Sequence, residues 1–131
     1  MFRSFTWKEF DESVEEITNR CYKYKLSGIY GIPRGGICLA VALSHKLNLK
    51  LQNKPEKFSL IVDDIYDTGF TLNKYKNIEK AKFFVLFSKI EPIWFESVHI
   101  SIKSEWIIFP WENKNNSINE RTSYEFKRNL V

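Results

Sequence analysis

The chain has 131 residues, 44% of them hydrophobic and 27% charged, a composition typical of a soluble globular protein with one domain over 1–131. Its net charge of +4 comes from lysines and arginines spread along the chain, so we expect no nucleic-acid partner. Cys21 and Cys38 lie far apart, which argues against a zinc site and a disulfide framework. Since no apolar run reaches membrane-spanning length and no signal-peptide pattern is present, we expect a cytoplasmic protein without a membrane partner.

The first predicted element is a helix over residues 5–21. Thr6 and Glu9 have the T-x-x-E spacing of a capping box, in which each side chain accepts from the other's free backbone N–H group. Apolar residues then recur at helical spacing on one face, namely Phe10, Val14, Ile17 and Cys21. We interpret this face as core packing rather than as a binding groove.

A strand, a glycine-rich turn and a second helix follow in that order. We expect the strand at Leu26–Tyr30, the turn at 31–36 (GIPRGG) and the helix at Ile37–Leu47, which together make a βα unit. Gly35 and Gly36 would let a ligand approach the backbone closely, and Arg34 offers a forked cation suited to phosphate oxygens. Taken alone, the segment is explained as well or better by an ordinary turn, since Pro and Gly mark turns of every kind.

The remaining segments continue the alternation of strands and helices. We expect a brief strand around Leu49 and Leu51, a turn at 53–57, a strand at 58–64, a short helix at Leu72–Ile78, a buried strand at Phe83–Phe87 and an outer strand at Val98–Ile102. This order predicts an α/β fold: a single domain with a mostly parallel twisted sheet flanked by helices. The polar segment 113–131 fits a final helix, capped by Ser117 and Glu120, and a frayed tail about equally well.

The most informative segment is Ser59–Leu72, SLIVDDIYDTGFTL. Its apolar run ends in Asp63 and Asp64, and Asp67 then opens a short polar turn. In open α/β sheets, ligands bind at the carboxyl ends of such strands. Two carboxylates suit a diol or a metal, and a Thr/Gly turn offers hydroxyl and N–H groups to a phosphate. The segment therefore predicts a sugar-phosphate site. A phospho-receiver domain also has paired acids, but it needs an acceptor Asp after a later strand, where this chain has Ser88 and Lys89.

Together these segments resemble the type I phosphoribosyltransferases, which bind 5-phosphoribosyl-1-pyrophosphate (PRPP). The signature turn, the upstream IPRGG turn, FSK at 87–89 and EWIIFPWE at 105–112 occur in the family's order over roughly residues 5–112. The last two segments and the first helix are similar to those of the xanthine–guanine and hypoxanthine (purine) subgroup. The fold implied is that of the family, with a small C-terminal base-binding region.

The resemblance implies a role for each matching position. Arg34, Gly35 and Gly36 would hold the pyrophosphate, and Asp63 and Asp64 would bind the ribose hydroxyls and Mg²⁺, the metal directly or through substrate and water. The 5-phosphate would lie in the turn formed by Thr68, Gly69, Phe70 and Thr71. Asp67 would be the catalytic acid/base, Lys89 would donate to the purine 6-oxo group, Trp106 would stack on the base, and the Ile107 backbone would contact its edge.

The residues alone leave two of these assignments open. Lys89 also fits a lysine at a strand end whose stem packs along apolar surface, and Trp106 also fits a core residue ahead of Ile107. Their position after the phosphate-binding segments favours the functional reading.

One departure from the family affects the predicted activity. Family members have a long flexible excursion that closes over PRPP, but here only Leu49–Lys57 separates the second helix from the Ser59 strand. We expect phosphoribosyl transfer from PRPP to hypoxanthine, guanine or xanthine, giving a nucleoside 5′-monophosphate and pyrophosphate in purine salvage. The alternative is a non-catalytic PRPP- or nucleotide-binding regulatory module. Exposed apolar residues near Trp94 and Trp111 suggest a homo-oligomer, a dimer or tetramer.

Overall fold

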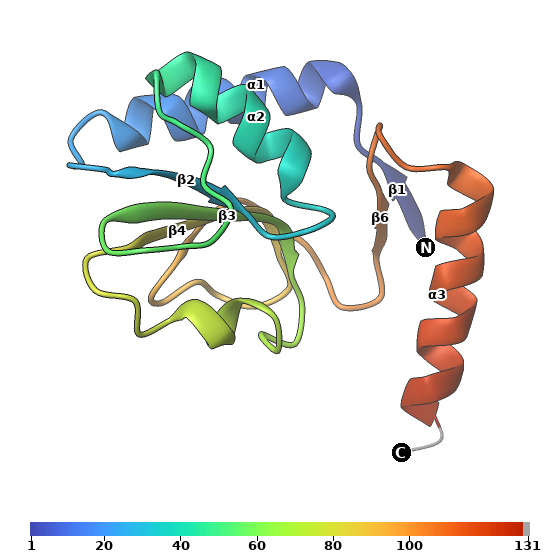
Figure 1. Ribbon diagram of the computed structural model, residues 1–131. Helices are drawn as coiled ribbons and strands as arrows, with labels where there is room; N and C mark the ends of the chain where they lie inside the picture. Colours follow the sequence, from blue (N-terminus) through green and yellow to red (C-terminus); the bar gives the residue numbers. More distant parts are fainter. Residues whose placement is uncertain (130–131) are drawn as a thin grey trace.

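The central sheet of the protein consists of four parallel strands. The computed structural model describes residues 1–129, with side chains up to Tyr124. The sheet order is β2-β3-β4-β5, and every pairing in it is parallel (Figure 1). The strands are β2 (Gly28–Gly31), β3 (Ser59–Tyr66), β4 (Lys82–Ser88) and β5 (Glu96–Ile100). The predicted α/β fold is therefore confirmed, and β5 is one of the two outer strands of the sheet.

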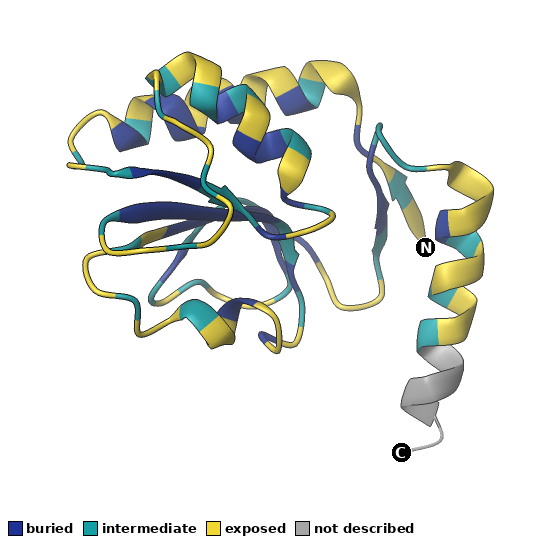
Figure 2. Cartoon of the chain, viewed as in Figure 1, coloured by how far each residue is buried: buried dark blue, intermediate teal, exposed yellow. Residues whose placement is uncertain are grey.

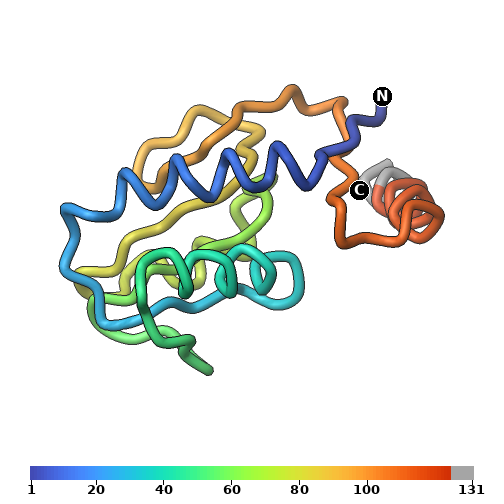
Figure 3. Tube along the Cα trace, turned by 90° about the horizontal axis from the view of Figure 1, so that it is seen from above, coloured from blue at the N-terminus to red at the C-terminus, as the bar shows by residue number. Residues whose placement is uncertain are grey.

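Two helices cover one face of this sheet. Helices α1 (Trp7–Cys21) and α2 (Ile37–Leu47) lie side by side above it (Figures 1 and 3). The capping box of α1 is confirmed, because the Glu9 N–H donates to Thr6 Oγ1 at 3.1 Å and the Thr6 N–H donates to Glu9 Oε1 at 3.2 Å. Helix α2 has Gly36 at its N-cap and no side-chain cap. Its first N–H groups thus point into the glycine-rich turn.

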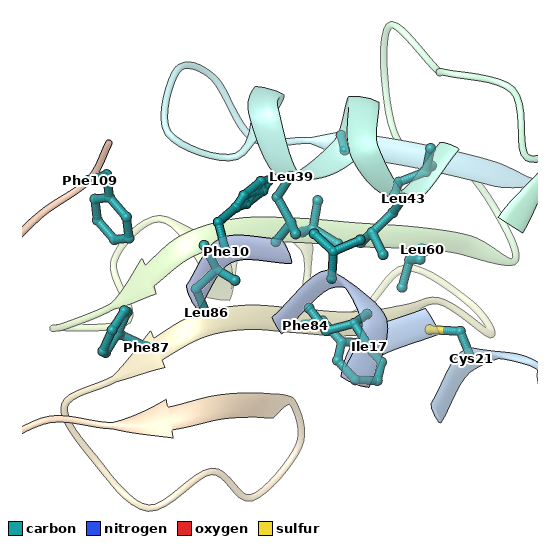
Figure 4. Close-up of a cluster of buried hydrophobic side chains, with 14 of the residues drawn as sticks. Phe10, Ile17, Cys21, Leu39, Leu43, Leu60, Phe84, Leu86, Phe87 and Phe109 are labelled. Atoms are coloured by element: carbon teal, nitrogen blue, oxygen red, sulfur yellow. The ribbon is translucent and has the colours of Figure 1, made fainter. Parts of the chain in front are cut away.

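The core explains the near-continuous apolar runs of the central strands. Both faces of β3 and β4 are buried, as expected for parallel strands covered on two sides (Figure 2). Alternate residues face α1 and α2, including Leu60, Phe84 and Leu86 with Phe10, Ile17, Leu39 and Leu43 (Figure 4). The other set packs beneath the sheet against the 3₁₀ helix η1 (Leu72–Tyr75), with Tyr66 stacked on Phe95 at 4.3 Å between ring centroids.

A second, two-stranded sheet lies beside the main one. Strands β1 (Phe2–Ser4) and β6 (Trp106–Ile108) pair in parallel, and α3 (Lys114–Asn129) follows β6 (Figure 1). Of the two alternatives for 113–131, the helix is therefore confirmed over Lys114–Asn129, and residues 130–131 lie outside the described residues. Its predicted cap is wrong: Ser117 lies inside the helix, and Asn113 Oδ1 accepts from the Asn116 N–H at 3.0 Å.

The boundaries of several predicted elements need correction. The β3 strand does not end at the acids, because the ladder with β4 continues through Tyr66 and Ser88. The helix expected at Leu72–Ile78 is only the 3₁₀ turn η1, since the N–H groups of Lys76 and Ile78 bond three residues back. Leu51 forms a single bridge to Ile29 rather than a strand. Strand β2 begins at Gly28 instead of Leu26, and β5 covers Glu96–Ile100 rather than Val98–Ile102.

The connection between α2 and β3 is as short as the sequence indicates. It is held along the β2 edge, where the Gln52 N–H donates to the Ile29 carbonyl at 2.8 Å and the Ile29 N–H donates to the Lys50 carbonyl at 2.9 Å. Gln52 Oε1 also accepts from the Ser59 hydroxyl at 2.6 Å. The connection therefore contains no long loop that extends over the carboxyl ends of the strands. Among residues 1–129, no helix is both long and apolar enough to cross a membrane.

Candidate active site

Three strand ends meet at one edge of the main sheet. The carboxyl end of β2 leads into the glycine-rich turn, β3 leads into the Asp67–Thr71 turn, and β4 leads into Lys89. The parallel register places these ends side by side, and the Lys89 N–H donates to the Tyr66 carbonyl at 2.8 Å. This is the edge at which α/β sheets bind ligands.

Two adjacent acids lie in the second half of β3. Asp63 is buried and Asp64 is half-buried; Asp63 Oδ1 accepts from the Asp64 N–H at 2.8 Å, and Asp64 Oδ1 accepts from the Ile65 N–H at 2.7 Å. Burial raises the pKa of both carboxyls, and the neighbouring Asp64 raises that of Asp63 further. The pair therefore favours a proton or a bound cation over two free negative charges.

The glycine-rich turn lies directly against this acid pair. A Cβ atom on Gly35 would stand 2.1 Å from Asp64 Oδ2, and one on Gly36 would stand 2.4 Å from the Val62 carbonyl oxygen. Only glycine fits such a close approach. The peptide between Pro33 and Arg34 is cis, and the Arg34 side chain is exposed at the opening of the turn. The structure thus brings together the two segments that the sequence separates by almost thirty residues.

The Asp67–Thr71 turn forms the other wall of a cleft of about 280 Å³. Gly69 has φ +84°, and its own lack of a side chain makes room for the Tyr66 hydroxyl and Asn73. The Asn73 N–H donates to the Gly69 carbonyl, and Phe70 is 75% exposed. The lining of this cleft includes Gly35, Asp63, Asp64, Asp67, Thr68, Gly69, Phe70 and Thr71. Eight of the predicted site residues therefore share one cleft.

Lys89 ties down the neighbouring loop between β5 and β6. Its ammonium donates to the carbonyl oxygens of Ile102, at 2.9 Å, and of Glu105. Burial lowers the pKa of Lys89, and the nearby Asp67 and Glu105 carboxylates oppose this effect. Lys89 is thus placed between the acidic turn and the loop that carries Trp106. Its donation to a purine stays a prediction, and its contacts here are with these two carbonyls and, at 3.4 Å, with the Ser101 hydroxyl.

Trp106 and Ile107 lie in β6. Trp106 is half-buried, and its Nε1–H donates to Ser117 Oγ on α3 at 3.0 Å. The Ile107 side chain is buried, and its backbone pairs with Arg3 of β1. The Trp106 ring lies 5.8 Å from the ring of Tyr124, between centroids. Trp106 and Ile107 thus belong to a small subdomain formed by β1, β6 and α3.

A second cleft of about 650 Å³ adjoins the first. Arg34, Gly35 and Asp64 line one side of it, and Glu112 and Glu120 lie on the other side, with Asn116. Burial and the charges of Asp64 and Glu120 raise the pKa of Glu112, although its Oε1 accepts from the Phe109 N–H at 2.8 Å. The two clefts together run from Arg34 to the Asp67–Thr71 turn.

Sequence reasoning assigned no role to Glu112 or Tyr124. The Tyr124 hydroxyl donates to Asp67 Oδ2 at 2.9 Å, across 57 positions of the chain. One available signal was the spacing of Ser117, Arg121 and Tyr124, which places the three on one face of a helix. Tyr66, Trp94, Phe95 and His99 pack against other rings.

The donor set of the site fits a magnesium ion that shares its ligands with a substrate. Carboxylate oxygens are the ligands that Mg²⁺ prefers, and a cation would relieve the repulsion between two adjacent carboxyls with raised pKa. Among the described residues, no group of three or more His, Cys, Asp or Glu side chains is arranged to hold a metal. A metal here would therefore need oxygen atoms from substrate or water.

The chain is similar in sequence and in fold to known purine phosphoribosyltransferases. No protein-family model matches the chain. The xanthine-guanine phosphoribosyltransferase of Idiomarina loihiensis is 26% identical to it over 140 residues, covering 82% of this chain and 84% of that protein. The purine phosphoribosyltransferase of Pyrococcus horikoshii superposes with a TM-score of 0.73 and 26% identity, covering 86% and 94% of the two chains. The xanthine-guanine-hypoxanthine phosphoribosyltransferase of Helicobacter pylori also has a TM-score of 0.73, with 18% identity and 92% and 99% coverage.

The fold, with its two turns at the carboxyl ends of the strands, is that of the type I phosphoribosyltransferases. The chain is similar to purine phosphoribosyltransferases in sequence and in fold, so the predicted resemblance to the purine subgroup is confirmed.

Proposed function

We propose that the protein transfers the 5-phosphoribosyl group of PRPP to a 6-oxopurine, giving a nucleoside 5′-monophosphate and pyrophosphate. The observation that carries this proposal is the contact between Gly35 and the Asp64 carboxylate. It joins a turn suited to pyrophosphate to acids suited to a ribose diol and a cation, while the Thr68–Thr71 turn lies across the same cleft. One PRPP molecule needs all three features side by side.

The residues divide the chemistry between them. The bond between ribose C1′ and pyrophosphate breaks, and its electron pair leaves with the pyrophosphate. A ring nitrogen of the purine forms the new bond to C1′, and the proton of its imidazole edge passes to the Asp67 carboxylate. Arg34 and the N–H groups at the start of α2 stabilise the charge on the leaving pyrophosphate.

Magnesium would be held by Asp63 and Asp64, directly or through substrate oxygens and water, and would supply positive charge at the leaving group. The 5-phosphate would rest on the backbone of Thr68, Gly69, Phe70 and Thr71. Trp106 would form the stacking surface for the base, the Ile107 backbone would contact its edge, and Lys89 would exchange one of its carbonyl partners for the 6-oxo group. Catalysis in the cytoplasm by a homo-oligomer completes the proposal.

The test is an incubation of purified protein with PRPP, Mg²⁺ and, separately, hypoxanthine, guanine, xanthine and adenine. We expect the matching nucleoside 5′-monophosphate from at least one 6-oxopurine, and little from adenine, which has an amino group where Lys89 would donate. Asp67→Asn serves as the control with strongly reduced activity. Formation of nucleotide from adenine alone would contradict the proposed base class.

The short connection between α2 and β3 favours a second candidate, a non-catalytic PRPP- or nucleotide-binding module. Closure of a lid excludes water and completes the site in many transferases, and this connection is held along the β2 edge instead. Calorimetry with PRPP and with GMP distinguishes the two candidates. Binding with Mg²⁺ but without turnover of any purine would favour the module.

A further inference from the structure

Helix α3 is fastened to the β1–β6 subdomain by residues on one of its faces. Ser117 accepts from the Trp106 indole at 3.0 Å. One turn further on, the Arg121 guanidinium donates to the Met1 carbonyl at 2.9 Å and to the Ser104 carbonyl at 3.0 Å, and it stacks over the Phe2 ring. Positions 117, 121 and 124 follow the i, i+4, i+7 spacing of one helix face, so the same contacts direct Tyr124 toward the site.

Tyr124 then joins two groups of the proposed base site. Its hydroxyl donates to Asp67 Oδ2 at 2.9 Å, and its ring lies 5.8 Å from that of Trp106 with the planes at 51°. Tyr124 is half-buried, so its hydrogen bond is partly screened from water. A tyrosine with only two rotatable side-chain bonds, held in this way, is a rigid support for a carboxylate.

We propose that Tyr124 is a positioning residue for Asp67 in the proposed transfer reaction. Its hydroxyl uses one carboxylate oxygen, Oδ2, and thereby fixes the plane of the carboxylate. The other oxygen, Oδ1, is left to accept the proton from the imidazole edge of the purine. A general base works efficiently only when it is held at the right place, and without Tyr124 the Asp67 side chain can rotate among other positions. This inference rests on the proposed function.

Helix α3 also forms one side of the site. The first half of the helix lines the 650 Å³ cleft through Asn116 and Glu120, opposite Arg34 and Gly35. Its second half brings Tyr124 to Asp67. The helix thus borders the site along the side where Trp106 lies, and Tyr124 is the residue through which the helix contacts Asp67.

The experiment measures kcat and KM for PRPP and for the purine in Tyr124→Phe, which keeps the ring and removes the hydroxyl. The matched control is Tyr22→Phe, because Tyr22 is exposed at the end of α1. We expect kcat to fall about tenfold in Tyr124→Phe, from the loss of one hydrogen bond to a charged group, with the KM for PRPP unchanged within about twofold. The control should match the wild type.

A double-mutant comparison separates positioning from a structural role. In an Asp67→Asn background, Tyr124→Phe should change the residual rate by less than about twofold, because the group that it positions is absent. An unchanged kcat in the single variant would overturn the inference, and so would an equal loss in the Asp67→Asn background or a loss of the fold in thermal unfolding. If the wild type forms no nucleotide and binds neither PRPP nor GMP, the proposed function itself fails, and the inference fails with it.

Discussion

Asp63→Asn should stabilise the unliganded protein at neutral and alkaline pH but not at acid pH. Asp63 is buried beside Asp64, and burial, followed by the Asp64 charge, raises its pKa from the ordinary value of 3.8 to about 9. Between these two values the folded protein binds more protons than the unfolded chain. The free energy of unfolding therefore falls as pH rises through this window, and the loss is complete above the raised pKa. Asparagine cannot ionise, and its Oδ1 can still accept the Asp64 N–H bond that Asp63 accepts at 2.8 Å.

The size of the effect follows from the window. At pH 7 the medium lies about three units above the ordinary pKa, and each unit corresponds to about 1.4 kcal/mol. We therefore expect Asp63→Asn to be more stable than the wild type by about 2 to 4 kcal/mol at pH 7, and by less than about 1 kcal/mol at pH 4.

Urea unfolding followed by circular dichroism at pH 4, 5.5, 7 and 8 measures this difference. The control is Asp11→Asn, since Asp11 is exposed on α1, and its difference from the wild type should stay constant across the series. A difference for Asp63→Asn that is the same at every pH, or a variant less stable than the wild type at pH 8, would refute the burial argument for the acid pair.

Three further outcomes follow from the site. In Gly35→Ala the added Cβ would lie 2.1 Å from Asp64 Oδ2, so we expect PRPP affinity to fall at least about tenfold by calorimetry; unchanged affinity would contradict the contact. Asp67→Asn should lower kcat about a hundredfold and leave PRPP affinity within about threefold, and a fully active variant would remove Asp67 from the chemistry. Because the pKa values of Asp63 and Asp64 are raised, binding of Mg²⁺ with PRPP should release protons and strengthen from pH 6 to pH 8, whereas binding independent of pH and of EDTA would exclude the acid pair as the metal site.

The sequence predicted the parts of the fold that depend on local patterns. The apolar runs of β3 and β4, the capping box at Thr6 and the glycines at 35 and 36 each have a short-range signal, and the structure has them as expected. The predicted end of β3 at residue 64 is wrong, because an acidic side chain does not by itself end a strand. The ladder to β4 continues past Asp63, since backbone pairing does not depend on the side chain's charge.

Other features depend on distant residues and have no such local signal. Strands β1 and β6 have three residues each and lie about a hundred positions apart, so neither is long enough to show alternation. The helical stripe of Ser117, Arg121 and Tyr124 is polar, and it packs through hydrogen bonds rather than through apolar area. Hydrophobic periodicity therefore gives no signal for the helix face that reaches Asp67.

The most direct test of the central claim is the stoichiometry of the proposed reaction. Purified protein with PRPP, Mg²⁺ and the best 6-oxopurine should form nucleoside 5′-monophosphate and pyrophosphate in equal amounts, quantified by chromatography and mass spectrometry. Loss of PRPP without nucleotide, or binding of PRPP with no product from any purine, would contradict phosphoribosyl transfer as the function of this site.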